Sequence, residues 1–150
     1  MSSFSYVLGE NSRILFVDDD PILREFAQVN LASPLAAIEA AADGAEAVSR
    51  LAVRSYDLIL LDLEMPVMDG FAVLSLLRAD PLTEHLPVIV QTGREDVEAI
   101  DRAFRLGATS FVTKPLNWRL LSYQIRYVLR ASEAERRVRA ASADTRAAAA

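Results

Sequence analysis

The chain has 150 residues, 52% of them hydrophobic, no cysteine and a formal net charge of −5 at pH 7. These values predict one domain with a sizeable core and without disulfides or thiolate chemistry. No apolar run is long enough to cross a membrane, and the N-terminus lacks the basic and apolar segments of a signal peptide, so we expect a cytoplasmic protein. Seven arginines against three acidic residues after residue 118 leave −9 for residues 1–118, which disfavours nonspecific binding to nucleic acid.

Five short apolar runs predict strands, and they cover residues 13–17, 36–41, 57–61, 87–91 and 109–113. Nearly continuous apolar runs are typical of a parallel sheet that is covered on both faces. The second run is rich in alanine and could be helical by propensity, but the alternation of strands and helices favours a strand.

A helical pattern follows each run, and four of the five helices are preceded by a capping residue. The caps are Asp20, Asp43, Asp69 and Asn117. Apolar residues with helical spacing are expected to mark one face of each helix. In chain order they are Ile22, Phe26 and Val29; Ala47, Val48 and Leu51; Val73, Leu74 and Leu77; Val97, Ile100 and Phe104; and Leu121, Ile125 and Val128.

The fifth helix has no clear stop signal before about residue 141. A helix of about 25 residues would be about 37 Å long, which exceeds what one small sheet can cover. Tyr127, Ala131, Ala134, Val138 and Ala141 continue the pattern at spacings of three and four, which is typical of a weak, alanine-rich coiled-coil seam. The alanine-rich end of the chain is expected to fray.

Five consecutive βα units predict a doubly wound α/β sheet with helices on both faces. A (β/α)₈ barrel is excluded because it needs eight units and roughly 250 residues. Right-handed crossovers are expected throughout. We expect a flexible N-terminus at residues 1–10, a folded domain at residues 11–130 and an extension of the last helix at residues 131–150.

Polar side chains follow four of the predicted strands at their carboxyl ends. Asp18 and Asp19 follow the first strand, Asp62 the third, Thr92 the fourth and Lys114 the fifth. Parallel strands bring these ends to one edge, where ligands bind in open α/β sheets. Two carboxylates about 4 Å apart repel by roughly 4 kcal/mol at an effective dielectric near 20, so the cluster needs a cation or a proton.

Each of these residue types suits phosphoryl chemistry. Asp62 is an oxygen nucleophile that needs no deprotonation at pH 7. The carboxylates of Asp18 and Asp19 are hard oxygen ligands of the kind that Mg²⁺ prefers. Thr92 can donate a hydrogen bond to a phosphoryl oxygen, and Lys114, the only lysine of the chain, can supply a positive charge.

The chain resembles the receiver domain of two-component response regulators over residues 11–130. The resemblance rests on four stretches, ILFVDDDP at 14–21, LDLEMPVMDG at 61–70, QTG at 91–93 and FVTKP at 111–115. Singly these motifs are modest, but their order and spacing make the combination specific. The resemblance implies a flavodoxin-like five-stranded sheet of order 2-1-3-4-5. Gln91 is more polar than expected at its position.

The resemblance also implies a role for each residue at this edge. Asp62 would accept a phosphoryl group from a phosphohistidine, and Lys114 would pair with the phosphate. Thr92 would hydrogen-bond to the phosphate on activation, and Phe111 would be a switch aromatic that turns inward. The Mg²⁺ ligands would be Asp18, Asp19, Asp62 and, through its backbone carbonyl, Glu64.

The implied partner is a sensor histidine kinase or a histidine phosphotransfer protein. The implied output is a changed surface on the fourth helix, fifth strand and fifth helix, so the domain would be a signalling module rather than an enzyme. Residues 117–130 resemble junctions that precede sensor or diguanylate cyclase domains, which suggests the N-terminal part of a larger regulator. No DNA-binding helix-turn-helix fits after residue 118, and a homodimer through the C-terminal helix is compatible with the pattern.

Two alternatives are weighed against this interpretation. A haloacid-dehalogenase-like phosphohydrolase would use Asp18 as nucleophile and Asp20 as acid/base. Against it, Pro21 follows at once, no cap domain exists, Asp62 has no role, and Asp20 is better explained as a helix cap. The second alternative, a receiver-shaped interaction module that is never phosphorylated, is disfavoured by the complete residue set.

Overall fold

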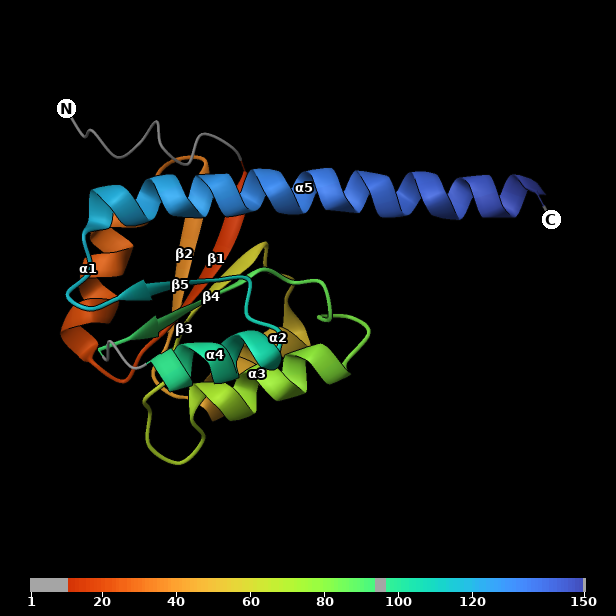
Figure 1. The fold of residues 1–150 in the computed structure, drawn as a ribbon. Helices are drawn as coiled ribbons and strands as arrows, with labels where there is room; N and C mark the ends of the chain where they lie inside the picture. The colour runs from red at the N-terminus through yellow and green to blue at the C-terminus, as the bar shows by residue number, and fades with distance from the viewer. Residues whose placement is uncertain (1–10, 94–96, 150) are drawn as a thin grey trace.

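One parallel sheet of five strands forms the centre of the molecule, in the order β2-β1-β3-β4-β5 (Figure 1). The computed structural model describes residues 11–93 and 97–149, so the expected flexible segment 1–10 lies outside the described residues. Each strand lies within one residue of its prediction, and the doubly wound, flavodoxin-like fold class is confirmed. The strands are β1 (Ser12–Val17), β2 (Ala36–Ala41), β3 (Leu58–Asp62), β4 (Val88–Thr92) and β5 (Ser110–Thr113).

A helix follows each strand. The helices are α1 (Pro21–Leu31), α2 (Gly44–Val53), α3 (Gly70–Ala79), α4 (Val97–Arg105) and α5 (Trp118–Ala149). The four predicted caps are confirmed, because Asp20, Asp43, Asp69 and Asn117 accept hydrogen bonds from backbone N–H groups of the first helical turns at 2.8–3.1 Å. These bonds satisfy donors that a helix N-terminus otherwise leaves unpaired.

The sheet is covered on both faces, with α1 and α5 on one side and α2, α3 and α4 on the other (Figure 1). Alternate residues along the central strands therefore belong to two separate cores. Phe16, Leu60 and Ile89 pack with α1 and α5, where Leu121 and Ile125 are buried. The opposite core contains Leu15, Ile59, Val90, Val73 and Leu77, among others. This double burial explains why the central strands have continuous apolar sequences.

The expected apolar face of α1 is wrong. Ile22, Phe26 and Val29 are 59%, 48% and 72% exposed, whereas Ala27 and Leu31 are buried against the sheet. The helix carries apolar residues on two faces with nearly the same spacing, so periodicity alone does not identify the face that packs. Ala27 and Leu31 lie in the same core as Phe16, and Leu23 packs against it.

The same correction applies to α4. Val97 and Phe104 are exposed and Ile100 is only partly buried, while Ala103 is the buried residue of the helix. The expected faces of α3 and α5 are confirmed by their buried apolar residues. In α2, Ala47 is buried and its two expected neighbours are half-buried. Small residues at helix–sheet contacts are poorly visible to a hydrophobic pattern.

The last helix is much longer than the sheet it covers. Its 32 residues correspond to about 48 Å at 1.5 Å per residue. Leu121, Ile125 and Val128 are buried, but no residue among 131–149 is. Figure 1 shows this segment projecting beyond the domain. The helix therefore has an inner part that belongs to the core and an outer part, residues 131–149, that contains no buried residue.

Candidate functional site

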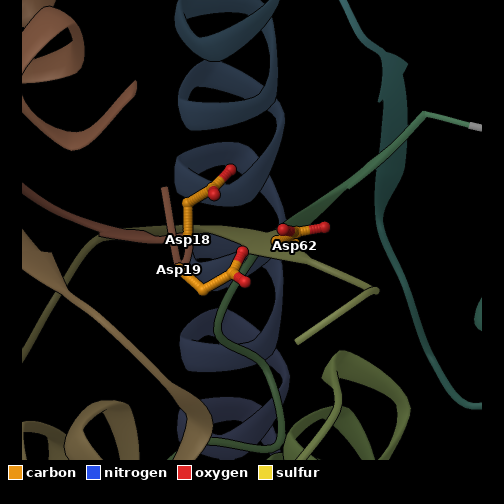
Figure 2. Close-up of side chains that lie close together, drawn as sticks. All are labelled: Asp18, Asp19 and Asp62. Atoms are coloured by element: carbon orange, nitrogen blue, oxygen red, sulfur yellow. The ribbon is translucent and has the colours of Figure 1, made fainter. Parts of the chain in front are cut away.

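Two carboxylates meet at the carboxyl edge because β1 and β3 are neighbours in the sheet. Val17 pairs with Leu61 in the parallel register, so the next residues, Asp18 and Asp62, lie side by side. Asp19 completes an acidic trio, and one oxygen from each member lies within 4.8 Å of the others (Figure 2). Asp18 and Asp62 are 0% and 2% exposed, whereas Asp19 faces solvent.

Lys114 is the cation that faces the two buried carboxylates. Its Nζ lies 2.8 Å from Asp18 Oδ2 as an ion pair and donates a hydrogen bond to Asp62 Oδ2 at 3.2 Å. Its backbone N–H donates to the Thr92 carbonyl, which fixes the end of β5 to the end of β4. The peptide bond between Lys114 and Pro115 is cis. Within residues 11–93 and 97–149, Lys114 is thus the side chain that forms ion pairs with both buried carboxylates.

Burial and neighbouring charges shift the pKa values of two groups at the site. Burial raises the pKa of Asp62 to about 6, and the charge of Asp18 adds to the increase; the Glu64 N–H and Lys114 oppose it. Burial lowers the pKa of Lys114, but the hydrogen bond and charge of Asp18 and the charge of Asp62 outweigh it, so this pKa is raised. The Asp62 shift is thus mainly an effect of burial, whereas the Lys114 shift reflects the two carboxylates beside it.

The loop after β3 holds the Asp62 carboxylate in place. The Glu64 backbone N–H donates to Asp62 Oδ1 at 3.0 Å, and the Glu64 side chain is exposed. A Cβ on Gly70 would lie 2.3 Å from the Asp62 carbonyl oxygen, so only glycine lets α3 begin against the end of β3. Val67 has a φ of 69° in the same loop. The loop between β3 and α3 is therefore a tight turn next to the acidic trio.

The two expected switch residues differ in burial. Thr92 is buried at the end of β4. Phe111 is 41% exposed and its ring meets that of Phe104 in α4 edge to face, with centroids 6.3 Å apart. Phe111 therefore lies outward, in contact with α4. The structure brings together Asp18, Asp19, Asp62 and Lys114 from the predicted set.

The acidic trio fits a hard divalent cation. It offers only oxygen ligands, their spacing suits a shared ion, and the exposed Asp19 opens the cluster to solvent. Burial and the neighbouring charge of Asp18 raise the pKa of Asp62, and a bound cation would oppose both effects. The residues present are therefore compatible with Mg²⁺.

One polar residue beside the site was noted in the sequence only as unusual. Gln91 is fully buried in β4 and lies opposite Asp62 in the strand register. A glutamine inside an otherwise apolar strand was the available signal, since buried polar side chains normally require a partner.

This fold and this edge are those of a receiver domain. Residues 14–126 match the family described as the response regulator receiver domain, and the chain belongs to that family. Receiver domains are signalling modules that interact with histidine kinases or phosphotransfer proteins. The phosphohydrolase alternative is not favoured, and Asp20, its acid/base, caps α1 through the Ile22 N–H.

The similar proteins include some that are much longer than this chain and others of about the length of one receiver domain. The chain is 40% identical over 112 residues to a probable cyclic di-GMP phosphodiesterase of Vibrio cholerae, covering 75% of this chain and 25% of that protein. It is 34% identical over 120 residues to the response regulator PleD of Caulobacter vibrioides, covering 80% and 26%. The structure of the chemotaxis protein CheY4 of Vibrio cholerae matches with a TM-score of 0.74 at 29% identity, covering 78% and 98%.

The chain spans about a quarter of the length of both curated relatives named above. No helix in the described part of the chain has the length and hydropathy needed to cross a membrane.

Proposed function

We propose that this receiver domain accepts a phosphoryl group on Asp62 from a phosphohistidine of a sensor histidine kinase or a histidine phosphotransfer protein. We expect this transfer to take place in the cytoplasm. The proposal rests on the environment of the buried Asp62 carboxylate. One of its oxygens accepts from the Glu64 N–H and the other from Lys114, which also forms an ion pair with Asp18. This arrangement positions one oxygen nucleophile beside one lysine cation.

Transfer replaces one bond to phosphorus with another. An Asp62 oxygen attacks phosphorus, a P–O bond forms, the P–N bond to the donor breaks, and its electron pair stays on the imidazole. The pKa of Asp62, about 6, leaves the carboxylate mostly ionised at pH 7. Lys114 then moves its charge from the carboxylates toward the transferred oxygens. Phosphoryl transfer depends chiefly on such positioning and charge neutralisation.

Mg²⁺ would be held by Asp18, Asp19, Asp62 and the backbone carbonyl of Glu64. When bound, the ion supplies the positive charge that the trio lacks and that the incoming phosphoryl group requires. The exposed position of Asp19 leaves one side of the cluster free for a donor to approach.

The readout begins at the two switch residues. The Thr92 hydroxyl would donate a hydrogen bond to a phosphoryl oxygen and shift toward it. Phe111 would turn inward and leave its contact with Phe104. Because this contact joins β5 to α4, its loss changes the surface formed by α4, β5 and α5. The domain thus acts as a switch, and its chemistry is limited to gaining and losing its own phosphoryl group.

Incorporation of labelled phosphate from acetyl phosphate with Mg²⁺ tests the assignment. The wild-type domain is expected to take up one phosphoryl group per chain, and Asp62→Asn none, because the amide is not a nucleophile for phosphorus. Asp101→Asn, on the exposed surface of α4, is the control for a lost charge and is expected to match the wild type.

Two results would contradict the proposal. Hydrolysis of a small phosphoester that Asp18→Asn abolishes and Asp62→Asn leaves intact would support the phosphohydrolase. Absence of both phosphate uptake and Mg²⁺ binding in the wild type would support an interaction module that is never phosphorylated.

We further propose that residues 131–150 link the receiver, residues 11–130, to another part of a larger regulator, and that α5 pairs with a second copy of this chain. Support comes from the seam of Tyr127, Ala131, Ala134, Val138 and Ala141, all exposed on α5. Small and apolar residues at this spacing suit a close helix pair. We propose no direct contact with nucleic acid, because the negative charge of residues 1–118 would be repelled by the phosphate backbone.

Light scattering with and without Mg²⁺ and beryllofluoride, a phosphoryl mimic, tests the pairing. The mass is expected to rise toward that of a dimer when the mimic binds. Val138→Glu, which places a charge in the seam, is expected to prevent the rise, and Ala140→Glu, on the opposite side of the helix, to allow it. An unchanged mass for the wild type would contradict pairing through α5.

A further inference from the structure

Gln91 is a fully buried glutamine in β4 whose side-chain amide has no hydrogen-bond partner among the described residues. Its backbone carbonyl is already used, because it accepts from the Leu63 N–H at 3.0 Å. Leaving a buried amide unpaired costs free energy that an apolar residue of similar size would not cost. A buried polar group without a protein partner requires an explanation, and a partner gained in another state of the site provides one.

The strand register places Gln91 next to the phosphoacceptor. Asp62 pairs with Gln91 across β3 and β4, and Gln91 pairs with Val112 across β4 and β5. Opposite residues of parallel strands project from the same face, and neighbouring strands are about 4.8 Å apart. Lys114, two residues beyond Val112, shares this face. The Gln91 amide thus belongs to the same layer of side chains as Asp62 and Lys114.

Both oxygens of Asp62 already accept hydrogen bonds in this state. Oδ1 accepts from the Glu64 N–H and Oδ2 from Lys114. A phosphoryl group adds three acceptor oxygens at this point and attracts Lys114 away from the carboxylate. New acceptor capacity therefore appears beside a buried donor that lacks an acceptor.

We propose that Gln91 is a further phosphoryl-binding residue of this receiver, which donates a hydrogen bond from its side-chain N–H to the group on Asp62. The inference rests on the proposed function of Asp62. In the unmodified domain the amide is unpaired, and in the modified domain it is paired. Gln91 thereby destabilises the first state and stabilises the second, which favours retention of the phosphoryl group.

Beryllofluoride titration of Gln91→Met in the presence of Mg²⁺, followed by calorimetry, tests the inference. Methionine keeps the length of the side chain and removes the donor. The dissociation constant is expected to rise about tenfold, because a hydrogen bond to a charged acceptor is lost. The urea midpoint of the free domain is expected to rise as well, because the unpaired amide is gone. Ile89→Met, on the same face of the same strand, is the control and is expected to bind within about twofold of the wild type.

The opposite signs of the two effects separate a phosphoryl-binding role from a structural one. A fall in the urea midpoint of Gln91→Met would show that the amide supports the free fold, for example through a buried water, and would overturn the inference. Equal affinity of Gln91→Met and the wild type for beryllofluoride would also overturn the inference. It would not affect the assignment of Asp62 as the phosphoacceptor. If the wild type itself does not bind beryllofluoride, the phosphoacceptor proposal fails instead. Gln91→Leu provides the same comparison should the methionine variant not fold.

Discussion

Asp62→Asn is expected to raise the free energy of unfolding of the metal-free domain by about 2–3 kcal/mol at pH 7. Burial raises the pKa of the Asp62 carboxyl from 3.8 to about 6 in the folded state. The folded state therefore holds this proton more tightly than the unfolded chain. The stabilisation that results is complete below about pH 4 and is lost as the pH rises through about 6, at about 1.4 kcal/mol per pKa unit. The Asp62→Asn variant does not lose this stability at pH 7, because asparagine does not ionise.

Urea unfolding in EDTA at pH 4 and pH 7 checks this expectation. The advantage of Asp62→Asn over the wild type is expected to be large at pH 7 and small at pH 4. Asp101→Asn serves as the control for the removal of an exposed carboxylate. An advantage of the same size at both pH values would indicate a packing effect rather than the charge of Asp62.

Lys114→Met is expected to destabilise the same metal-free domain by about 3 kcal/mol at pH 7. Lys114 lies 2.8 and 3.2 Å from oxygens of two carboxylates that are almost completely buried. Removing one partner of a buried ion pair typically costs 3–5 kcal/mol, because the remaining charge is left uncompensated. The lower end applies here because the lysine side chain itself is 24% exposed.

The loss at Lys114 is expected to depend on Asp62. In the Asp62→Asn background, Lys114→Met should cost less, because only one buried carboxylate then remains without its cation. Lys114→Arg keeps the positive charge and is the matched control. A cost for Lys114→Met that is the same in both backgrounds, measured by urea unfolding at pH 7, would mean that the two side chains are not energetically coupled.

The strands and the site edge were predictable because they follow from burial and chain direction. Residues 58–61, for example, are apolar on both faces of the sheet, which is required of a strand between two helical layers. Parallel direction then brings Asp18, Asp62 and Lys114 to one edge whatever the details of packing. The helix caps were predictable for a similar reason, since Asp43 satisfies donors within a few residues of itself.

The packing faces of two helices and the balance of charges were not predictable. In α1 the decisive contact is made by Ala27, and an alanine carries almost no weight in a hydrophobic pattern. The sequence placed a cation near the carboxylates but did not show that Lys114 contacts both Asp18 and Asp62. The isolation of the Gln91 amide likewise depends on which groups surround it.

The lone lysine also makes this site the one place where amine chemistry can reach a side chain. Lys114 is the only side-chain amine in 150 residues, so an acylating reagent can modify no other side chain of that kind. The two carboxylates raise its pKa and keep the amine protonated, which makes it a poor nucleophile in the unmodified domain. The rate at which Lys114 gains an acyl mass therefore reports how firmly the carboxylates hold it. Acetyl phosphate carries both an acetyl and a phosphoryl group. A phosphorylation experiment with this donor can therefore acetylate Lys114 as well as phosphorylate Asp62.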